Sequence, residues 1–165
     1  MIEEEKKQKK LSSIITIILI ILGMLLLIFL VYQNNETIIN FINPIDKNDK
    51  IPPEITYVTI TSDNETNSNY AEEGNTITLK FKFNEQLGTN PTIIINGKET
   101  TLYKRNGYYV SYYQVLNQPT TNKQITFKIR DYKDRNNNLG KEIIETTDKT
   151  TVTIIAKGSK IPSSN

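Results

Sequence analysis

The sequence contains no cysteine and no histidine. Without cysteine the chain has no disulfide, no thiolate nucleophile, no zinc–cysteine centre and no cysteine that could carry a lipid anchor. Without histidine it lacks the side chain that most often acts as a general base and as a transition-metal ligand. These absences exclude the commonest forms of nucleophilic and metal-dependent catalysis.

Strong net charge is absent too, because 20 basic residues stand against 18 acidic ones. Nucleic-acid binding generally requires a concentrated basic surface, so we expect none here. The sequence also contains no G-x-S-x-G element, phosphate-binding loop or dinucleotide fingerprint. We therefore expect a protein that is not an enzyme.

One long apolar stretch is present, from Ile14 to Val31, and it contains no charged residue. A helix needs roughly 20 apolar residues to cross the ~30 Å hydrocarbon core of a bilayer, and flanking Leu11 and Tyr32 bring the stretch to that length. A helix satisfies its own backbone polar groups, so it can lie in lipid. The sequence predicts a transmembrane anchor over residues 11–32.

Two other interpretations of this stretch stay open. A cleaved signal peptide has an apolar core of roughly 7–15 residues and a small-residue cleavage site, whereas Phe29–Gln33 offers no such site. A core helix of a soluble protein would be shorter or would show a polar face. For an anchor, the excess of lysine marks the cytoplasmic side. Four lysines closely precede the helix: Lys6, Lys7, Lys9 and Lys10. Residues 1–10 are then a cytoplasmic tail, and the residues after the helix are extracytoplasmic.

Residues 33–52 are rich in Asn, Asp and Pro, which predicts a linker. Apolar residues at helical spacing between Ile38 and Ile45 indicate that part of it is helical. From residue 53 to 157 the apolar pattern changes to a period of two, most clearly from Ile77 to Phe83. Asn-Gly pairs at 96–97 and 106–107 predict tight hairpins. About seven short strands, including one at 141–145, predict an all-β, Greek-key sandwich or small barrel, followed by a disordered tail at 158–165.

Three runs carry a resemblance to a known family: Ile55–Thr61, with the pattern P-x-I-x-x-V-x-I; Gly74–Phe81, with G-[DN]-T-[IV]-T-L-x-F; and Pro91–Gly97, with P-T-[VI]-x-I-x-G. The segment thereby resembles the Ig-like repeats of bacterial cell-surface and adhesin-type proteins. This sequence departs from the family in two ways. Asn136-Asn137 replaces the usual Gly-Asn of the closing region. The domain also occurs in a single copy, whereas tandem copies are common in the family. The resemblance implies a single Ig-like β-sandwich with an adhesive or spacer role and no catalytic residue.

The loop from residue 131 to 145 is a candidate calcium site. Asp134, Asn136 and Asn138 alternate, and Glu145 follows Asp134 at the spacing of calcium loops that bind from positions 1, 3, 5 and 12. Against this, Leu139 stands where such loops need glycine, and two basic residues lie in the loop. Asn and Asp also fill β-connections through their own turn chemistry, with no cation. Apart from this calcium possibility, we expect no cofactor.

Tyrosines gather in the strand from 108 to 115. If Tyr109 and Tyr113 face the core, then Tyr108, Val110 and Tyr112 face outward as a candidate binding surface, because exposed aromatic residues are enriched at interfaces. Tyrosine is also an ordinary strand residue that is often half exposed.

The sequence therefore predicts a single-pass, membrane-anchored extracytoplasmic Ig-like module whose partners are the lipid bilayer and an envelope or membrane protein. The alternatives are a carbohydrate- or cell-wall-binding module and a passive structural membrane subunit.

Overall fold

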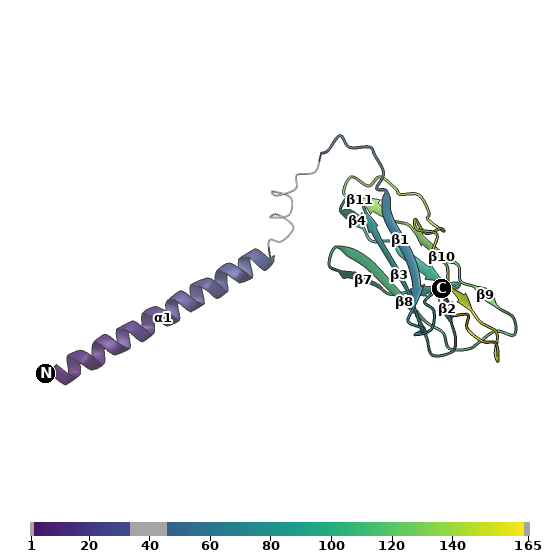
Figure 1. Cartoon of the computed structure of the whole chain (residues 1–165). Helices are drawn as coiled ribbons and strands as arrows, with labels where there is room; N and C mark the ends of the chain where they lie inside the picture. Colours follow the sequence, from purple (N-terminus) through teal and green to yellow (C-terminus); the bar gives the residue numbers. More distant parts are fainter. Residues whose placement is uncertain (1, 34–45, 164–165) are drawn as a thin grey trace. The chain divides into compact units, whose positions relative to one another are not determined.

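The computed structural model describes residues 2–33 and 46–163 (Figure 1). The chain divides into two compact units, one ending at Asp46 and one beginning at Lys47. We call the second the β unit.

The first unit contains the helix α1, Ile2–Gln33. It is longer than the predicted span because the Lys-, Glu- and Gln-rich residues 3–10 are also helical, as expected of strong helix formers. Residues 3–30 are all exposed. Within the described residues, α1 is the one helix long and apolar enough to cross a membrane. The predicted helical part of the linker falls mainly on residues 34–45, outside the described residues.

The β unit is mostly antiparallel sheet, as predicted. Its larger sheet has the order β1 (Ile55–Ser62), β3 (Thr76–Phe83), β8 (Tyr108–Gln114) and β7 (Leu102–Arg105), all antiparallel (Figure 1). The predicted alternation of β3 is confirmed, since its apolar residues are buried and the residues between them are half-buried or exposed.

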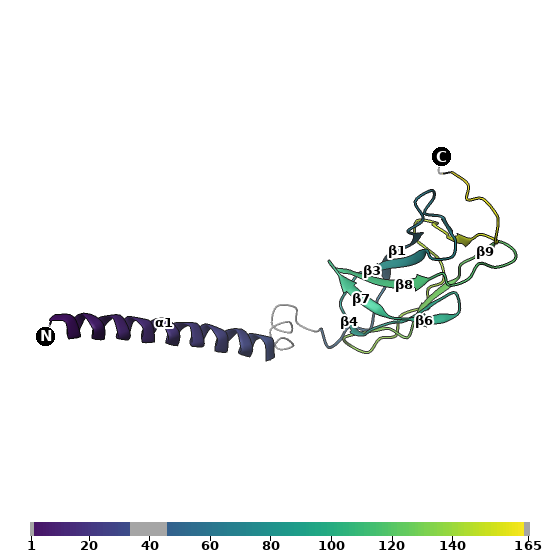
Figure 2. The same ribbon diagram turned by 90° about the horizontal axis from the view of Figure 1, so that it is seen from below.

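A second sheet has the order β10 (Phe127–Arg130), β5 (Thr92–Ile95) and β6 (Lys98–Thr100). Its edge strand β6 is labelled in Figure 2. The predicted hairpin between β5 and β6 is confirmed: Asn96 and Gly97 have φ of 52° and 78°, the left-handed values that a type I′ turn needs. The second Asn-Gly pair, at 106–107, makes the same turn between β7 and β8, with φ of 50° and 78°.

The chain passes from the second sheet to the first at Thr101. Residues 98–105 therefore form two strands in different sheets: β6 pairs with β5, whereas β7 pairs with β8. The crossing is fixed by Ser111, which is fully buried, donates to the Thr101 carbonyl at 2.8 Å and lies 2.7 Å from the Thr100 hydroxyl. A small polar side chain in the core thus holds the corner between the sheets.

Five shorter strands complete the unit: β2 (Tyr70–Ala71), β4 (Leu87–Thr89), β9 (Lys123–Gln124), β11 (Lys133–Asp134) and β12 (Thr153–Ile154). β11 pairs with β4, and β12 lies between β2 and β9, pairing in parallel with β2.

The strand predicted at residues 141–145 is absent, and Ile143 forms an isolated bridge to Ile129 instead. The segment that follows turns onto the free edge of β1, where Thr147 N–H donates to the Val58 carbonyl at 3.0 Å. The backbone of this segment therefore hydrogen-bonds to the edge of β1 and does not continue as a strand beside β10.

Buried side chains from both sheets form one apolar core. Phe81 stacks on Tyr109 with ring centroids 5.4 Å apart, and the ring of Phe83 lies 4.7 Å from that of Tyr132. Residues of β5 and β10 close the same core, with Ile95 and Ile129 fully buried. The inward faces of the two sheets thus bury each other.

The two ends of the unit extend beyond the predicted limits of 53 and 157. At one end, the Asp49 carbonyl accepts a hydrogen bond from Asn138 Nδ2 at 3.1 Å. At the other, the Pro162 carbonyl accepts one from Asn67 Nδ2 at 3.1 Å. This hydrogen bond connects part of the tail to the β unit, and disorder of the tail stays a prediction. Residues 164–165 lie outside the described residues.

Candidate functional site

Three carboxylates converge at one place in the β unit. Asp49, Glu85 and Asp134 each contribute an oxygen, and these oxygens lie within 4.8 Å of one another. Pairing of β4 with β11 brings Glu85, just before β4, near Asp134, the last residue of β11. This pairing requires glycine at position 88, because a Cβ there would collide with the Asp134 carbonyl oxygen. We call these three residues the acidic cluster.

Asp134 is the buried member of the acidic cluster, with 2% of its surface exposed. Its Oδ1 accepts the backbone N–H groups of Asn136 and Asn138, both at 2.8 Å, and its Oδ2 accepts Asn138 Nδ2 at 2.7 Å. Hydrogen bonds to a charged acceptor offset the cost of burying it. Asp134 therefore organises the turn that follows β11, in which Asn137 has a φ of 67°.

The ionised form of Glu85 is destabilised by its place in the acidic cluster. Partial burial raises the pKa of the Glu85 carboxyl, and the negative charges of Asp134 and Asp49 raise it further. A carboxylate placed beside two others binds its proton more tightly, because like charges disfavour the ionised form.

The structure brings together three of the four predicted calcium ligands and separates the fourth. Asp134, Asn136 and Asn138 lie in one turn, whereas Glu145 lines a cavity elsewhere and is not a member of the acidic cluster. Calcium binding by these four residues therefore stays a prediction. The Asn138 amide nitrogen Nδ2 donates to Asp134 Oδ2 at 2.7 Å.

Sequence reasoning missed Asp49 and Glu85. Neither lies in a motif, and both reach Asp134 only through the β4–β11 pairing and the hydrogen bonds that hold the Asp49 segment. Three carboxylates are ligands that calcium accepts. Acidic side chains also gather without a cation, so the acidic cluster by itself does not identify a metal site.

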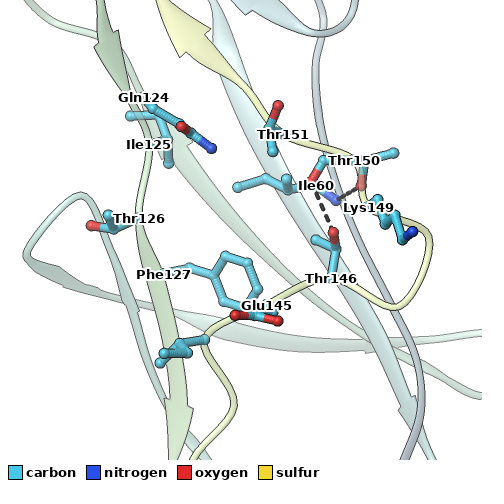
Figure 3. A pocket seen from close by; sticks show the side chains of 11 residues that line it. Ile60, Gln124, Ile125, Thr126, Phe127, Glu145, Thr146, Lys149, Thr150 and Thr151 are labelled. Carbon is cyan, nitrogen blue, oxygen red and sulfur yellow. Dashed lines mark hydrogen bonds between the residues drawn. The ribbon is translucent and has the colours of Figure 1, made fainter.

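The cavity that contains Glu145 has a volume of about 450 Å³ and lies beside the free edge of β1 (Figure 3). Ile60, Ile125 and Phe127 give it an apolar floor, and Glu145 and Lys149 supply one charge of each sign. The threonine hydroxyls here serve the backbone: Thr150 Oγ1 accepts the Ile60 N–H at 3.1 Å, and Thr146 Oγ1 donates to the Thr150 carbonyl at 2.9 Å. The lining offers polar contacts to a small molecule but shows no paired nucleophile and base.

The outward face of the larger sheet carries the predicted tyrosines. Cross-strand partners share a face, so the pairings of Thr78 with Tyr112 and of Lys80 with Val110 place these β8 residues opposite the core. Residues of β1 and β7 that pair with these outward positions belong to the same face. We call it the tyrosine–lysine face: Tyr57, Lys80, Lys82, Tyr103, Arg105, Tyr108, Val110 and Tyr112.

The predicted binding residues differ in exposure within this face. Tyr112 is 36% exposed and its neighbour Tyr103 is 44% exposed, and their rings are 5.7 Å apart. Tyr108 is half-buried, with Lys80 Nζ 4.1 Å from its ring centroid and the edge of Tyr57 against it. Val110 points outward but is only 6% exposed, so it supports the neighbouring rings and offers little contact area to a ligand.

No protein-family model, curated protein or solved structure matches this chain. The likeness to Ig-like repeats therefore stays a prediction.

Proposed function

We propose that the protein is a single-pass membrane protein that displays the β unit, as one Ig-like sandwich, on the extracytoplasmic side for contact with a membrane or envelope protein. One observation carries the proposal: the large apolar side chains of α1 from Leu11 to Leu30 are 45–65% exposed. An uncovered apolar surface of that length is stable in the hydrocarbon interior of a bilayer.

The orientation in the proposal follows from charge. The lysines of the first turns of α1 precede its apolar part, and lysine-rich flanks stay in the cytoplasm. The Ig-like form of the β unit is supported by its two antiparallel sheets, their shared core and the crossing at Thr101. A binding role is supported by the exposed tyrosine pair; catalysis is not part of the proposal.

The absence of cysteine makes the topology directly testable. Lys7→Cys and Lys157→Cys each introduce a single thiol into a chain that has none. A membrane-impermeant maleimide applied to intact cells should label the Lys157→Cys protein, and it should label the Lys7→Cys protein only after lysis. Equal labelling of both before lysis, or recovery of the unmodified protein in the soluble fraction, would overturn the anchor.

The binding role is tested by crosslinking in cells. The full chain is compared with a form that ends at Asp46, since residues from Lys47 onward belong to the β unit. A partner recovered with the full chain alone supports recognition by the β unit. The same proteins recovered with both forms would favour the passive-subunit alternative, in which α1 makes the contacts.

A carbohydrate-binding module is the second candidate, favoured by the exposed rings of Tyr103 and Tyr112. Retention of the β unit on isolated cell wall that is lost in Tyr103→Ala with Tyr112→Ala would support it. Thr78→Ala, on the same face beside Tyr112, is the matched control.

A further inference from the structure

Charge is segregated on the tyrosine–lysine face. The four strands that form it, β1, β3, β7 and β8, contain no Asp or Glu, and three of their four basic residues lie on this face: Lys80, Lys82 and Arg105. Elsewhere in the β unit the two signs alternate, as in the ion pairs of Lys128 with Glu142 and of Arg130 with Asp131. The strands of this face thus contribute basic side chains and no acidic ones.

Within the described residues, none of Lys80, Lys82 and Arg105 is paired with a carboxylate. Lys80 Nζ lies 4.1 Å and Lys82 Nζ 5.8 Å from the ring centroid of Tyr108, and such contacts leave the positive charge in place. Asp148 lies near the border of the face, where it accepts a hydrogen bond from Thr150 beside Thr59. An anionic partner therefore meets uncompensated positive charge across the middle of the sheet.

The arrangement of the tyrosine rings is better suited to the headgroup layer of a bilayer than to stacking on a sugar ring. Lys80 covers one face of Tyr108, and the edge of Tyr57 packs against the same ring. Tyr103 and Tyr112 contact each other at an interplanar angle of 52°. Stacking on a pyranose needs a free ring face, whereas the headgroup layer of a bilayer accepts tyrosines in many orientations, with the hydroxyl in water and the ring against lipid.

The tether brings this face within reach of a bilayer. Between the end of α1 at Gln33 and the start of the β unit at Lys47 the chain has 13 residues, which span at most ~45 Å. A unit of about 120 residues has a radius of gyration of roughly 14 Å, so any of its faces can approach the surface. Tethering also raises the effective concentration of the unit at the bilayer to the millimolar range. This step rests on the proposed function, in which α1 is the anchor.

We propose that the tyrosine–lysine face docks on anionic lipid headgroups of the bilayer that α1 spans. Lys80, Lys82 and Arg105 pair with lipid phosphates, while Tyr103 and Tyr112 enter the headgroup layer. The rest of the β unit, including the acidic cluster, stays in water and is available to a partner.

The test uses residues 47–165, which form a separate unit with their own core. Sedimentation with vesicles of phosphatidylcholine and 30% phosphatidylglycerol should carry this fragment down, and pure phosphatidylcholine should not. Each basic residue near an anionic surface contributes about fivefold to binding, so Lys80→Gln, Lys82→Gln and Arg105→Gln together should weaken it roughly a hundredfold. Raising the salt concentration should weaken it as well.

A matched variant removes the same charge elsewhere. Lys98→Gln, Lys123→Gln and Lys157→Gln change exposed positions off the face, and this protein should bind anionic vesicles with nearly unchanged affinity. The melting temperature of both variants is compared with that of the unmodified fragment, so that loss of folding is recognised.

A second measurement reports insertion. The chain contains no tryptophan, so Tyr112→Trp supplies a single tryptophan on the face, whose emission is excited selectively at wavelengths that tyrosine does not absorb. Its emission should shift to the blue with anionic vesicles and not with neutral ones.

Several results would overturn the docking proposal. These are absence of binding to anionic vesicles at low salt, equal weakening by both triple variants, and a tryptophan emission of the Tyr112→Trp protein that lipid does not change. Binding to polygalacturonate without binding to lipid would instead assign the face to an acidic glycan. Cysteine labelling tests whether α1 is a membrane anchor, and vesicle binding tests whether the β unit docks on lipid. Failure of the anchor and failure of the docking are therefore separate results.

Discussion

The helix α1 and the β unit contain the same kinds of apolar side chain in opposite surroundings. Leu22 and Leu27 in α1 are 56% and 64% exposed, whereas Leu79 and Ile77 in β3 are fully buried. Burial of such side chains is the main favourable term in folding. The β unit supplies that burial from its own two sheets. Residues 3–30 of α1 are all exposed, and under the proposed function the bilayer covers them.

The largest effect should come from charge placed on α1. Leu22→Asp with Leu26→Asp puts two carboxylates on one face of the helix, each costing about 2.5–3.5 kcal/mol in a bilayer. We expect the protein to leave the membrane fraction while the melting temperature of the β unit stays unchanged. Leu22→Val with Leu26→Val is the control and should remain in the membrane. A lower melting temperature of the β unit would show that the two units depend on each other.

Removing a large core side chain should destabilise the β unit and spare the anchor. Phe81 is fully buried and contacts Phe83 and Tyr109, so Phe81→Ala should lower the free energy of unfolding by about 3–5 kcal/mol. Thr78→Ala, on the opposite face of the same strand, should change it by less than about 0.5 kcal/mol. Urea denaturation of residues 47–165 measures both, and similar losses would contradict the register of β3.

Gly140 should tolerate a methyl group poorly. A Cβ at this position would overlap the ring of Tyr132, which is buried and donates its hydroxyl to the Lys141 carbonyl at 2.6 Å. Gly140→Ala should therefore cost about 1–3 kcal/mol through overpacking. Leu139→Ala is the neighbouring control, since Leu139 is exposed, and it should have little effect in the same denaturation experiment.

The smallest effect should come from the acidic cluster. Because the folded state raises the pKa of Glu85, the folded protein holds this proton more tightly than the unfolded chain. The contribution to stability is present below about pH 4.5, the ordinary value of a glutamate, and is lost as the pH rises through the raised value. Glu85→Gln should then stabilise the β unit at pH 7 by a few tenths of a kcal/mol, since solvent screens this partly exposed group.

Thermal melts at pH 4 and pH 7 measure this difference, with the exposed residue change Glu65→Gln as the control. A larger gain at pH 4 than at pH 7 would contradict the sign. The same proteins test the calcium prediction: a cation held by the acidic cluster would raise the melting temperature of the unmodified protein and not that of Glu85→Gln.

The sequence by itself determined the features that depend on neighbouring residues. The uninterrupted apolar run determined α1, the period of two from Ile77 to Phe83 determined the inward side of β3, and the two Asn-Gly pairs determined their hairpins, because backbone conformation and side-chain direction are local properties. The same alternation placed Tyr109 toward the core and Tyr112 outward.

Only the tertiary structure decided what depends on residues far apart in the chain. The passage between sheets at Thr101 depends on Ser111, the acidic cluster depends on Asp49 and Glu85 meeting Asp134, and Glu145 faces a cavity beside β1. The accumulation of cations on one side of the larger sheet also appears only when four separate strands are placed in register. Strand order and register bring such residues together, and no local pattern records them.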